Sequence, residues 1–293
     1  MPEQVRVKID LSKGRIMNKY NKKYDRTPRL RITLSFLLFT LLFYLFSLAE
    51  SNATVRYVSK TGLSIPPYTS WETATDSIQK CINISVFGDT IYVANGVYQE
   101  QVVMIDGLSL IGAGTDSCWI DSRQLITMQN YKTIDMKDSC LVKGFYIRSS
   151  YNFGYGYGIW AVGQTGLITQ NKFSEANRGI AVRASDIQVY KNHFFNIRGG
   201  VDVFTSNSIV RKNEIYILTD QAGEGISIMA LADNYSPLID SNVIMTIGDG
   251  IRKSLGASPT ITNNFIFLVD NAPDGIISGS FSFLRNVPFI NTS

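Results

Sequence analysis

The chain has 293 residues, of which 45% are hydrophobic and 18% are charged, and this composition excludes an intrinsically disordered protein. The net charge of +4 comes from the first 31 residues, which carry a balance of +7 and leave −3 for the remainder. A mildly acidic body gives no reason to expect nucleic-acid binding. The three cysteines show no CxxC spacing, so the sequence does not predict a zinc site.

The first predicted element is an apolar segment, ITLSFLLFTLLFYLFSLA, which covers residues 32–49 without a charge. This length is long for a signal-peptide core and just sufficient for a tilted membrane helix, so both a signal peptide and a transmembrane anchor fit. Small residues at 47–49 favour cleavage. In both interpretations the basic flank places residue 50 onward outside the cytoplasm, as a secreted or membrane-anchored cell-surface or periplasmic protein. We assign residues 1–54 to this leader and 55–293 to one folded domain.

The second predicted element is a helix within WETATDSIQKCINIS, residues 71–85. Its apolar positions recur at helical spacing. They are Trp71, Ala74, Ile78, Cys81 and Ile82. We expect this amphipathic helix to cover the open N-terminal end of a stack that begins with GDTIYVANGVYQE, residues 88–100.

After residue 160 the chain repeats itself. ITQNKF, VYKNHF, VRKNEI, IDSNVI and ITNNFI share an apolar residue, an asparagine three positions later and an apolar residue two positions after that. FLRNVP, residues 283–288, is a weaker sixth copy. The anchors are Asn171, Asn192, Asn213, Asn242, Asn264 and Asn286. Gly followed by Ile or Val recurs in phase with them, at Gly158, Gly179, Gly200, Gly225, Gly250 and Gly275.

A repeat of about 21–25 residues made of short alternating strands cannot close its own core. Stacking successive coils in parallel buries one face of every strand and pairs each backbone group with the next coil. The fold class is therefore predicted to be all-β, a right-handed parallel β-helix. We expect each asparagine to turn the chain between two strands and to bond the asparagine of the next coil, about 4.8 Å away.

Several segments carry a resemblance to a known family: YVSKTG, GDTIYVANGVYQE, LSLIGAG at 108–114 and VKGFYI at 142–147. They resemble the N-terminal portion of right-handed parallel β-helix proteins of the pectin lyase-like superfamily. The resemblance covers about residues 55–290 and is specific for fold, not for chemistry. It implies a carbohydrate partner, because the superfamily includes pectate lyases, polygalacturonases and pectin methylesterases beside non-enzymatic surface proteins. The domain has no obvious C-terminal cap before Ser293, so later coils are expected to be missing.

Aligned positions of successive coils form columns on the surface of such a stack. The residues before Gly place Glu224, Asp249 and Asp274 one above the other, and the residues after Ile or Val place Asp202 and Arg252 beside them. Stacked carboxylates repel each other unless a cation or distance relieves them, and several carboxylate oxygens suit Ca²⁺. Acidic residues at coil corners also occur simply as turn residues, and that interpretation stays open.

The acidic column resembles the calcium site of Ca²⁺-dependent pectate lyases. The resemblance implies Arg252, with Lys253 in reserve, as the base that abstracts the proton next to a uronate carboxylate. A further resemblance links GGVDVF, residues 199–204, to the segment of pectin methylesterases that carries the nucleophilic aspartate, here Asp202. The Gln-Asp pair and the Trp-rich motif with Arg of those esterases are missing, as is the Gly-His-Gly of polygalacturonases.

An aromatic segment, YNFGYGYGIW at 151–160, offers sugar-binding candidates in Tyr155, Tyr157 and Trp160, because rings stack on the apolar faces of sugars. Packing onto the stack is the alternative. His193, the only histidine, falls in a column of mixed character and is expected to be an ordinary surface residue. Two functions stay open: a polysaccharide-active enzyme, preferentially a Ca²⁺-assisted lyase, and a non-catalytic surface protein for adhesion, glycan binding or structure. Cys118 and Cys140, 22 residues apart, are expected to stack on adjacent coils, as a disulfide or as buried thiols.

Overall fold

The computed structural model describes residues 8–10, 15–17, 39–40, 53–151, 154–163, 165–218, 223–231, 235–254, 256–269 and 282–285. The chain divides into two units, 1–50 and 51–293. In the first unit β1 (Lys8–Asp10) pairs antiparallel with β2 (Arg15–Met17). No helix within the described ranges is long and apolar enough to cross a membrane. Most of the predicted apolar segment 32–49 lies outside these ranges, so the leader stays a prediction.

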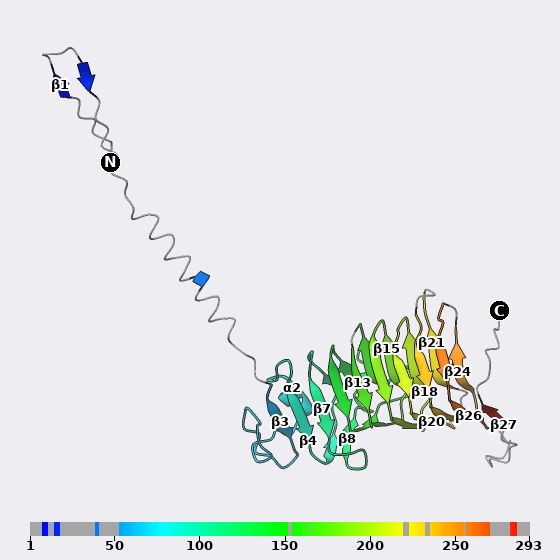
Figure 1. Ribbon diagram of the computed structural model, residues 1–293. Helices are drawn as coiled ribbons and strands as arrows, with labels where there is room; N and C mark the ends of the chain where they lie inside the picture. Colours follow the sequence, from blue (N-terminus) through cyan, green and yellow to red (C-terminus); the bar gives the residue numbers. More distant parts are fainter. Residues whose placement is uncertain are drawn as a thin grey trace. The chain divides into compact units, whose positions relative to one another are not determined.

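The second unit is a parallel β-helix in which three sheets run along one stack (Figure 1). Sheet I contains β3 (Val55–Val58), β4 (Thr90–Val93), β7 (Ser109–Gly112), β10 (Cys140–Lys143), β13 (Thr165–Thr169), β16 (Asp186–Tyr190), β19 (Ile209–Arg211), β22 (Leu238–Asp240) and β25 (Thr260–Thr262). Sheet II contains β5 (Gly96–Tyr98), β8 (Cys118–Asp121), β11 (Tyr146–Arg148), β14 (Lys172–Ser174), β17 (His193–Phe195), β20 (Glu214–Ile217), β23 (Val243–Thr246), β26 (Phe265–Leu268) and β27 (Ser282–Arg285). Sheet III contains β6 (Val102–Val103), β9 (Lys132–Met136), β12 (Tyr157–Val162), β15 (Arg178–Arg183), β18 (Gly199–Phe204), β21 (Glu224–Met229) and β24 (Asp249–Lys253).

Each coil therefore runs through sheet I, sheet II and sheet III before it returns to sheet I, and the predicted fold class is confirmed. The one departure is at the last strand. β27 holds the first three residues of the weak sixth repeat, FLR, and it pairs antiparallel with β26 instead of continuing the parallel stack. The repeat pattern thus predicts parallel pairing only where the asparagine motif is complete.

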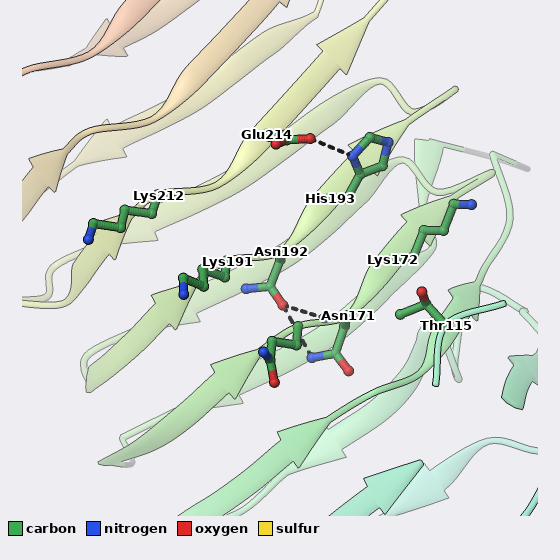
Figure 2. A pocket seen from close by; sticks show the side chains of 9 residues that line it. Thr115, Asn171, Lys172, Lys191, Asn192, His193, Lys212 and Glu214 are labelled. Carbon is green, nitrogen blue, oxygen red and sulfur yellow. Dashed lines mark hydrogen bonds and ion pairs between the residues drawn. The ribbon is translucent and has the colours of Figure 1, made fainter. Parts of the chain in front are cut away.

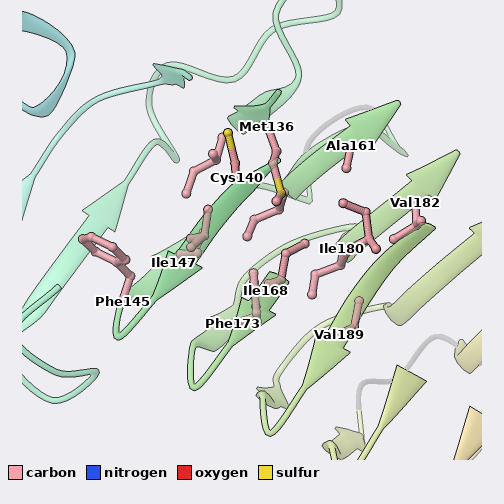
Figure 3. Close-up of a cluster of buried hydrophobic side chains, with 14 of the residues drawn as sticks. Met136, Cys140, Phe145, Ile147, Ala161, Ile168, Phe173, Ile180, Val182 and Val189 are labelled. Carbon is pink, nitrogen blue, oxygen red and sulfur yellow. The ribbon is translucent and has the colours of Figure 1, made fainter. Parts of the chain in front are cut away.

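The core is a set of inward columns of Ile, Val and Phe that all three sheets contribute. In sheet I, Val142, Ile168, Val189 and Val210 follow one another in register and are fully buried. In sheet II, the rings of Phe173 and Phe194 stack with centroids 4.8 Å apart. Figure 3 shows side chains from different sheets meeting inside the stack. Because β-branched residues fit a half-buried pleated surface, such columns form where the repeat places Ile or Val at the same position in every coil.

The glycine of the Gly-Ile or Gly-Val marker recurs at the start of the sheet III strands because this position has no room for a side chain. A Cβ atom at Gly179 would lie 2.5 Å from the ring of Phe194, and one at Gly225 would lie 2.4 Å from the carbonyl oxygen of Gly250. The backbone of sheet III thus lies close both to sheet II and to the next coil. Contact of this kind, rather than a special backbone angle, explains the second sequence marker.

The asparagine ladder lies at the corner between sheet I and sheet II and is fully inside the protein. The Oδ1 of Asn192 accepts hydrogen bonds from both the backbone N–H and the Nδ2 of Asn171, at 3.0 and 3.2 Å. The Nδ2 of Asn192 donates to the carbonyl of Ile168 at 2.9 Å, and the same pattern continues through Asn213, Asn242 and Asn264. The predicted bond between asparagines of successive coils is confirmed, and Asn286 lies outside the described residues.

The residue before each asparagine adopts a left-handed backbone conformation, with φ near +54°. These residues are Gln170, Lys191, Lys212, Ser241 and Asn263. An L-residue in this region costs roughly 1 kcal/mol or more, so the corner is a strained turn that the buried amide bonds keep in place. Because the left-handed turn residue points its side chain outward, Lys191 and Lys212 are both exposed on the edge of the stack.

The predicted helix exists but is shorter than residues 71–85. α2 spans Ile78–Ile82, with Ser77 as N-cap, and the carboxylate of Glu100 accepts bonds from the N–H groups of Ile78 and Gln79 at 3.0 and 2.9 Å. Ile78, Cys81 and Ile82 join the core. Trp71 is not part of the helix and is 51% exposed. The role of α2 as an end cover stays a prediction.

The expected stacking of Cys118 on Cys140 is wrong. Cys118 lies on β8 in sheet II and Cys140 on β10 in sheet I, because the coil between them has a different phase from the later repeats. Both are buried free thiols. Burial raises the pKa of Cys118 to about 11, so the thiol stays protonated and unreactive.

We expect Asn192→Ala to lower the free energy of unfolding by about 3 kcal/mol, because it leaves the buried N–H of Asn171 and the carbonyl of Ile168 without partners. Urea unfolding followed by circular dichroism measures the change. Gln188→Ala, an exposed amide on the strand before this corner, is the matched control and should change stability by less than about 0.5 kcal/mol. Equal losses in the two variants would contradict a special role for the ladder.

Candidate functional site

The outer face of sheet III carries the predicted columns. Trp160, Ala181, Asp202, Ser227 and Arg252 are successive partners in register on β12, β15, β18, β21 and β24. A second outward column, at the start of the same strands, pairs Tyr157 with Arg178 and Glu224 with Asp249. Ala181 is completely buried although its position faces outward, so the larger side chains around it close over this part of the sheet. The register read from the sequence therefore agrees with the structure.

The N-terminal half of this face is an aromatic cluster formed by Tyr131, Tyr155, Tyr157 and Trp160. Trp160 meets Tyr157 and Tyr131 edge to face, with centroids 4.9 and 5.4 Å apart, and Tyr155 lies 6.2 Å from Tyr131. Tyr155 is 38% exposed, whereas Tyr157 and Trp160 are half-buried. The sequence left two interpretations of these three side chains, sugar binding and packing on the stack. In the structure the rings pack against each other and remain partly exposed.

Cationic side chains border the aromatic cluster. The guanidinium of Arg183 lies 4.8 Å from the centroid of the Trp160 ring and 5.0 Å from that of Phe204. The ammonium of Lys132 lies 5.6 Å from the Trp160 centroid and also pairs with Asp135 at 3.2 Å. Cations that lie over rings place apolar ring surface and hydrogen-bond donors side by side.

The C-terminal half of the face is a chain of ion pairs. Arg178 bonds Asp202 and Glu224, each at 3.0 Å, and Arg252 bonds the other oxygen of Glu224 at 2.5 Å. The side chains of Asp202 and Glu224 are 19% and 17% exposed, whereas that of Arg252 is 55% exposed. Arginine thus separates the carboxylates that the sequence placed near one another.

Asp202 is held in two opposing environments. Burial raises the pKa of its carboxyl above the ordinary value, and the nearby carboxylate of Glu224 acts in the same direction, whereas Arg178 lowers it. Burial is the largest of these influences, so the net direction is upward despite the ion pair. A carboxyl with a raised pKa on an open face is a candidate for proton transfer or for binding a polar ligand.

Glu224 and Asp249 are neighbours in register, as predicted, but Glu224 is turned toward Arg178 and Arg252. Asp274 lies outside the described residues. Within the ranges given above, no three His, Cys, Asp or Glu side chains lie together in a way that could hold a metal ion. Arg252, the predicted base, is paired with Glu224, and Lys253 follows it in an exposed position. The calcium site and the catalytic roles of Arg252 and Asp202 stay predictions.

Sequence reasoning missed a hollow at the corner between sheets I and II, with a cavity volume of about 640 Å³. Its lining residues are Thr115, Gln170, Asn171, Lys172, Lys191, Asn192, His193, Lys212 and Glu214 (Figure 2). His193 is partly exposed, as expected of a surface residue, and its Nδ1 lies 3.1 Å from the Glu214 carboxylate. A signal was present in the repeats, because VYKNHF and VRKNEI both place Lys directly before the asparagine.

A family described as "Right handed beta helix region" matches residues 132–292. The chain belongs to this family. The match covers more than half of the 293 residues and agrees with the three-sheet stack of the structure. The predicted relation to right-handed parallel β-helix proteins is thereby confirmed. Among curated proteins, none matches this β-helix.

Solved structures similar to this β-helix include two pectin methylesterases and an alginate lyase. The pectin methylesterase from carrot is 11% identical, with a TM-score of 0.41 over 73% of this chain and 84% of the other. The enzyme from Yersinia enterocolitica is 10% identical, with a TM-score of 0.41 over 72% and 86%. The alginate lyase from Paenibacillus sp. is 15% identical, with a TM-score of 0.36 over 64% and 72%. Values this low say nothing about activity.

We expect Asp202→Asn to change how stability depends on pH. Because the folded state raises the pKa of Asp202 above its ordinary value of 3.8, the folded state binds this proton more tightly than the unfolded state. The wild type should therefore lose stability relative to the variant as pH rises from about 4, until Asp202 is ionised in the folded state. Urea unfolding of both proteins at a series of pH values measures this difference.

Asp240→Asn provides a contrast of opposite sign. Hydrogen bonds from Asn263 and Thr262 lower the pKa of Asp240, so the stability that its carboxylate contributes is present above about pH 4 and is lost as pH falls below that value.

If the wild type instead gained stability relative to Asp202→Asn as pH rose, the Arg178 ion pair would outweigh burial.

Proposed function

We propose that this β-helix binds polysaccharide along the outer face of sheet III, outside the cytoplasm. One observation carries the proposal: the two outward columns lead from the aromatic cluster to the ion pairs along the same face of sheet III. Tyr157 is the register partner of Arg178, and Trp160 is separated from Asp202 only by the buried Ala181. A straight row of rings and charged groups suits a linear polymer better than a compact ligand.

The two halves of the face offer complementary chemistry to a sugar chain. The partly exposed rings of Tyr155, Tyr157 and Trp160 provide apolar surfaces for the faces of sugar rings. Arg178 and Arg252 provide guanidinium N–H donors for hydroxyl or carboxylate oxygens, and Asp202 provides acceptors. Because Arg252 is more than half exposed, its guanidinium can bind a sugar carboxylate while Glu224 keeps Arg178. The face is therefore suited to acidic polysaccharides.

We expect Trp160→Ala to weaken binding of the full chain to a polyuronate by about tenfold, because it removes the ring that meets both Tyr131 and Tyr157. Affinity gel electrophoresis against polygalacturonate, alginate and a neutral glucan measures the effect. Trp119→Ala is the matched control. Trp119 packs against Tyr146 and Arg148 on sheet II, away from the proposed face. Equal weakening by both variants, or no binding to any glycan by the wild type, would refute the proposal.

A second candidate is that the same face is catalytic, as a Ca²⁺-assisted polyuronate lyase or as an esterase that uses Asp202. The observation that favours chemistry is the largely buried carboxyl of Asp202, whose pKa is raised while it lies against Arg178. For the lyase, Arg252 would abstract the proton next to the uronate carboxylate, with Glu224, Asp249 and Asp274 around the cation. Lys253, next to Arg252, would help to bind the substrate. Each step would use the polymer bound as proposed above.

We expect a lyase to form unsaturated product from polyuronate, followed by ultraviolet absorbance, and to lose this activity on chelation and in Arg252→Ala. An esterase would instead release methanol or acid from an esterified substrate and would lose activity in Asp202→Asn. Arg123→Ala, in the turn after β8, removes an arginine that is also paired with two carboxylates and is the control for general loss of charge. Activity that survives chelation and Arg252→Ala would exclude the lyase. No activity on a broad panel with retained binding would leave a non-catalytic surface protein.

A further inference from the structure

The hollow at the corner between sheets I and II collects basic side chains from three successive coils. Lys191 and Lys212 occupy the left-handed turn position before the ladder, and Lys172 and His193 are register partners at the starts of β14 and β17. Figure 2 shows Lys191 and Lys212 directed to one side of the corner and Lys172 and His193 to the other. We call these four residues the basic corner. Their charged ends lie on both sides of the buried asparagine ladder.

The basic corner has an excess of positive charge. Three lysines face one carboxylate, Glu214, and that carboxylate is bonded by His193 at 3.1 Å. In the part of the chain that the structure describes, no acidic side chain lies within 4.0 Å of the ammonium groups of Lys172, Lys191 or Lys212. Two of these groups lie over aromatic rings, Lys172 at 5.1 Å from the centroid of Phe195 and Lys191 at 5.0 Å from that of Tyr190.

The protein's own electrostatics agree with this charge balance. The pKa of the Tyr190 hydroxyl is lowered, first by its hydrogen bond to Lys191 and further by the charges of Lys212 and Arg211. A phenol is acidified in this way where the local potential is positive. The positive potential at this corner therefore attracts anions from solution.

The stack keeps these charges close together. Successive coils lie about 4.8 Å apart, and two ammonium groups at such a distance repel each other by about 1 kcal/mol in water. The asparagine ladder fixes the backbone at this corner, so the lysines can separate only by turning their side chains. On sheet III, by contrast, Arg178 and Arg252 alternate with carboxylates. An anion from outside the chain would supply at the basic corner what Asp202 and Glu224 supply on sheet III.

We propose that the basic corner binds a linear anionic polysaccharide, at a site separate from the face of sheet III. The lysines point in diverging directions over an open hollow, so they fit charges distributed along a polymer better than one small ion. The polar residues between them, Thr115 and Gln170, offer hydrogen bonds to hydroxyl groups. No Phe, Tyr or Trp side chain lines the described hollow, which disfavours single-stranded nucleic acid, whose bases stack on such rings.

The test compares dextran sulfate with uncharged dextran of the same length, using the full chain and isothermal titration at about 50 and about 200 mM salt. We expect binding of dextran sulfate only. The triple variant Lys172→Ala, Lys191→Ala, Lys212→Ala should lower the affinity at low salt by about tenfold or more and should flatten the dependence on salt, because fewer counterions are released. The triple variant Lys60→Ala, Lys80→Ala, Lys137→Ala removes the same charge elsewhere and should bind like the wild type.

Several outcomes would overturn the proposal. Equal losses in the two triple variants would reduce the effect to net charge, and tighter binding of duplex DNA with the same lysine dependence would assign the corner to another class of polymer. Trp160→Ala separates this site from that on sheet III. In a protein that already carries Trp160→Ala, the lysine substitutions should still lower the affinity for dextran sulfate by about tenfold or more, so failure of one proposal does not imply failure of the other.

Discussion

The hydrogen bond from one asparagine amide to the asparagine of the next coil is the constraint on which the rest of this structure depends. Each amide oxygen accepts two bonds from the preceding asparagine, and each amide nitrogen donates to a carbonyl of the coil before it. The ladder is buried, so a slip of one residue in one coil would leave several polar groups without partners, each at a cost of about 1–3 kcal/mol. The corner therefore fixes the phase of every strand that follows it.

Because the phase is fixed, equivalent positions of successive repeats line up as columns on the surface of the stack. Residues that share a position in the repeat become neighbours about 4.8 Å apart, whatever their chemistry. On sheet III this brings Trp160, Asp202 and Arg252 into one column, and ion pairs between coils balance the charges. At the corner it brings Lys191 and Lys212 together without a carboxylate between them. The same geometry thus produces one balanced face and one face with a net charge.

Much of this could be read from the sequence because it depends on the period. The asparagine and glycine markers predicted the parallel stack, the inward positions of Val189 and Phe194 and the columns on sheet III. Side-chain direction could not be read in the same way. Glu224 pairs with Arg178, 46 residues away, and this choice depends on which neighbour reaches it in space. The prediction that Cys118 and Cys140 stack on each other was wrong, because it took their gap of 22 residues for one period, whereas the two lie on different sheets.

The order of the sheets also decides how the two proposed surfaces relate to each other. Each coil passes from sheet I through the ladder corner to sheet II and then to sheet III, so the basic corner and the outer face of sheet III lie on opposite sides of the same coils, within residues 157–253. The core between them is packed with columns of Ile, Val and Phe. What the geometry allows is simultaneous binding of two polymer segments. Their combined affinity then depends on the spacing of the segments rather than on a change in the protein.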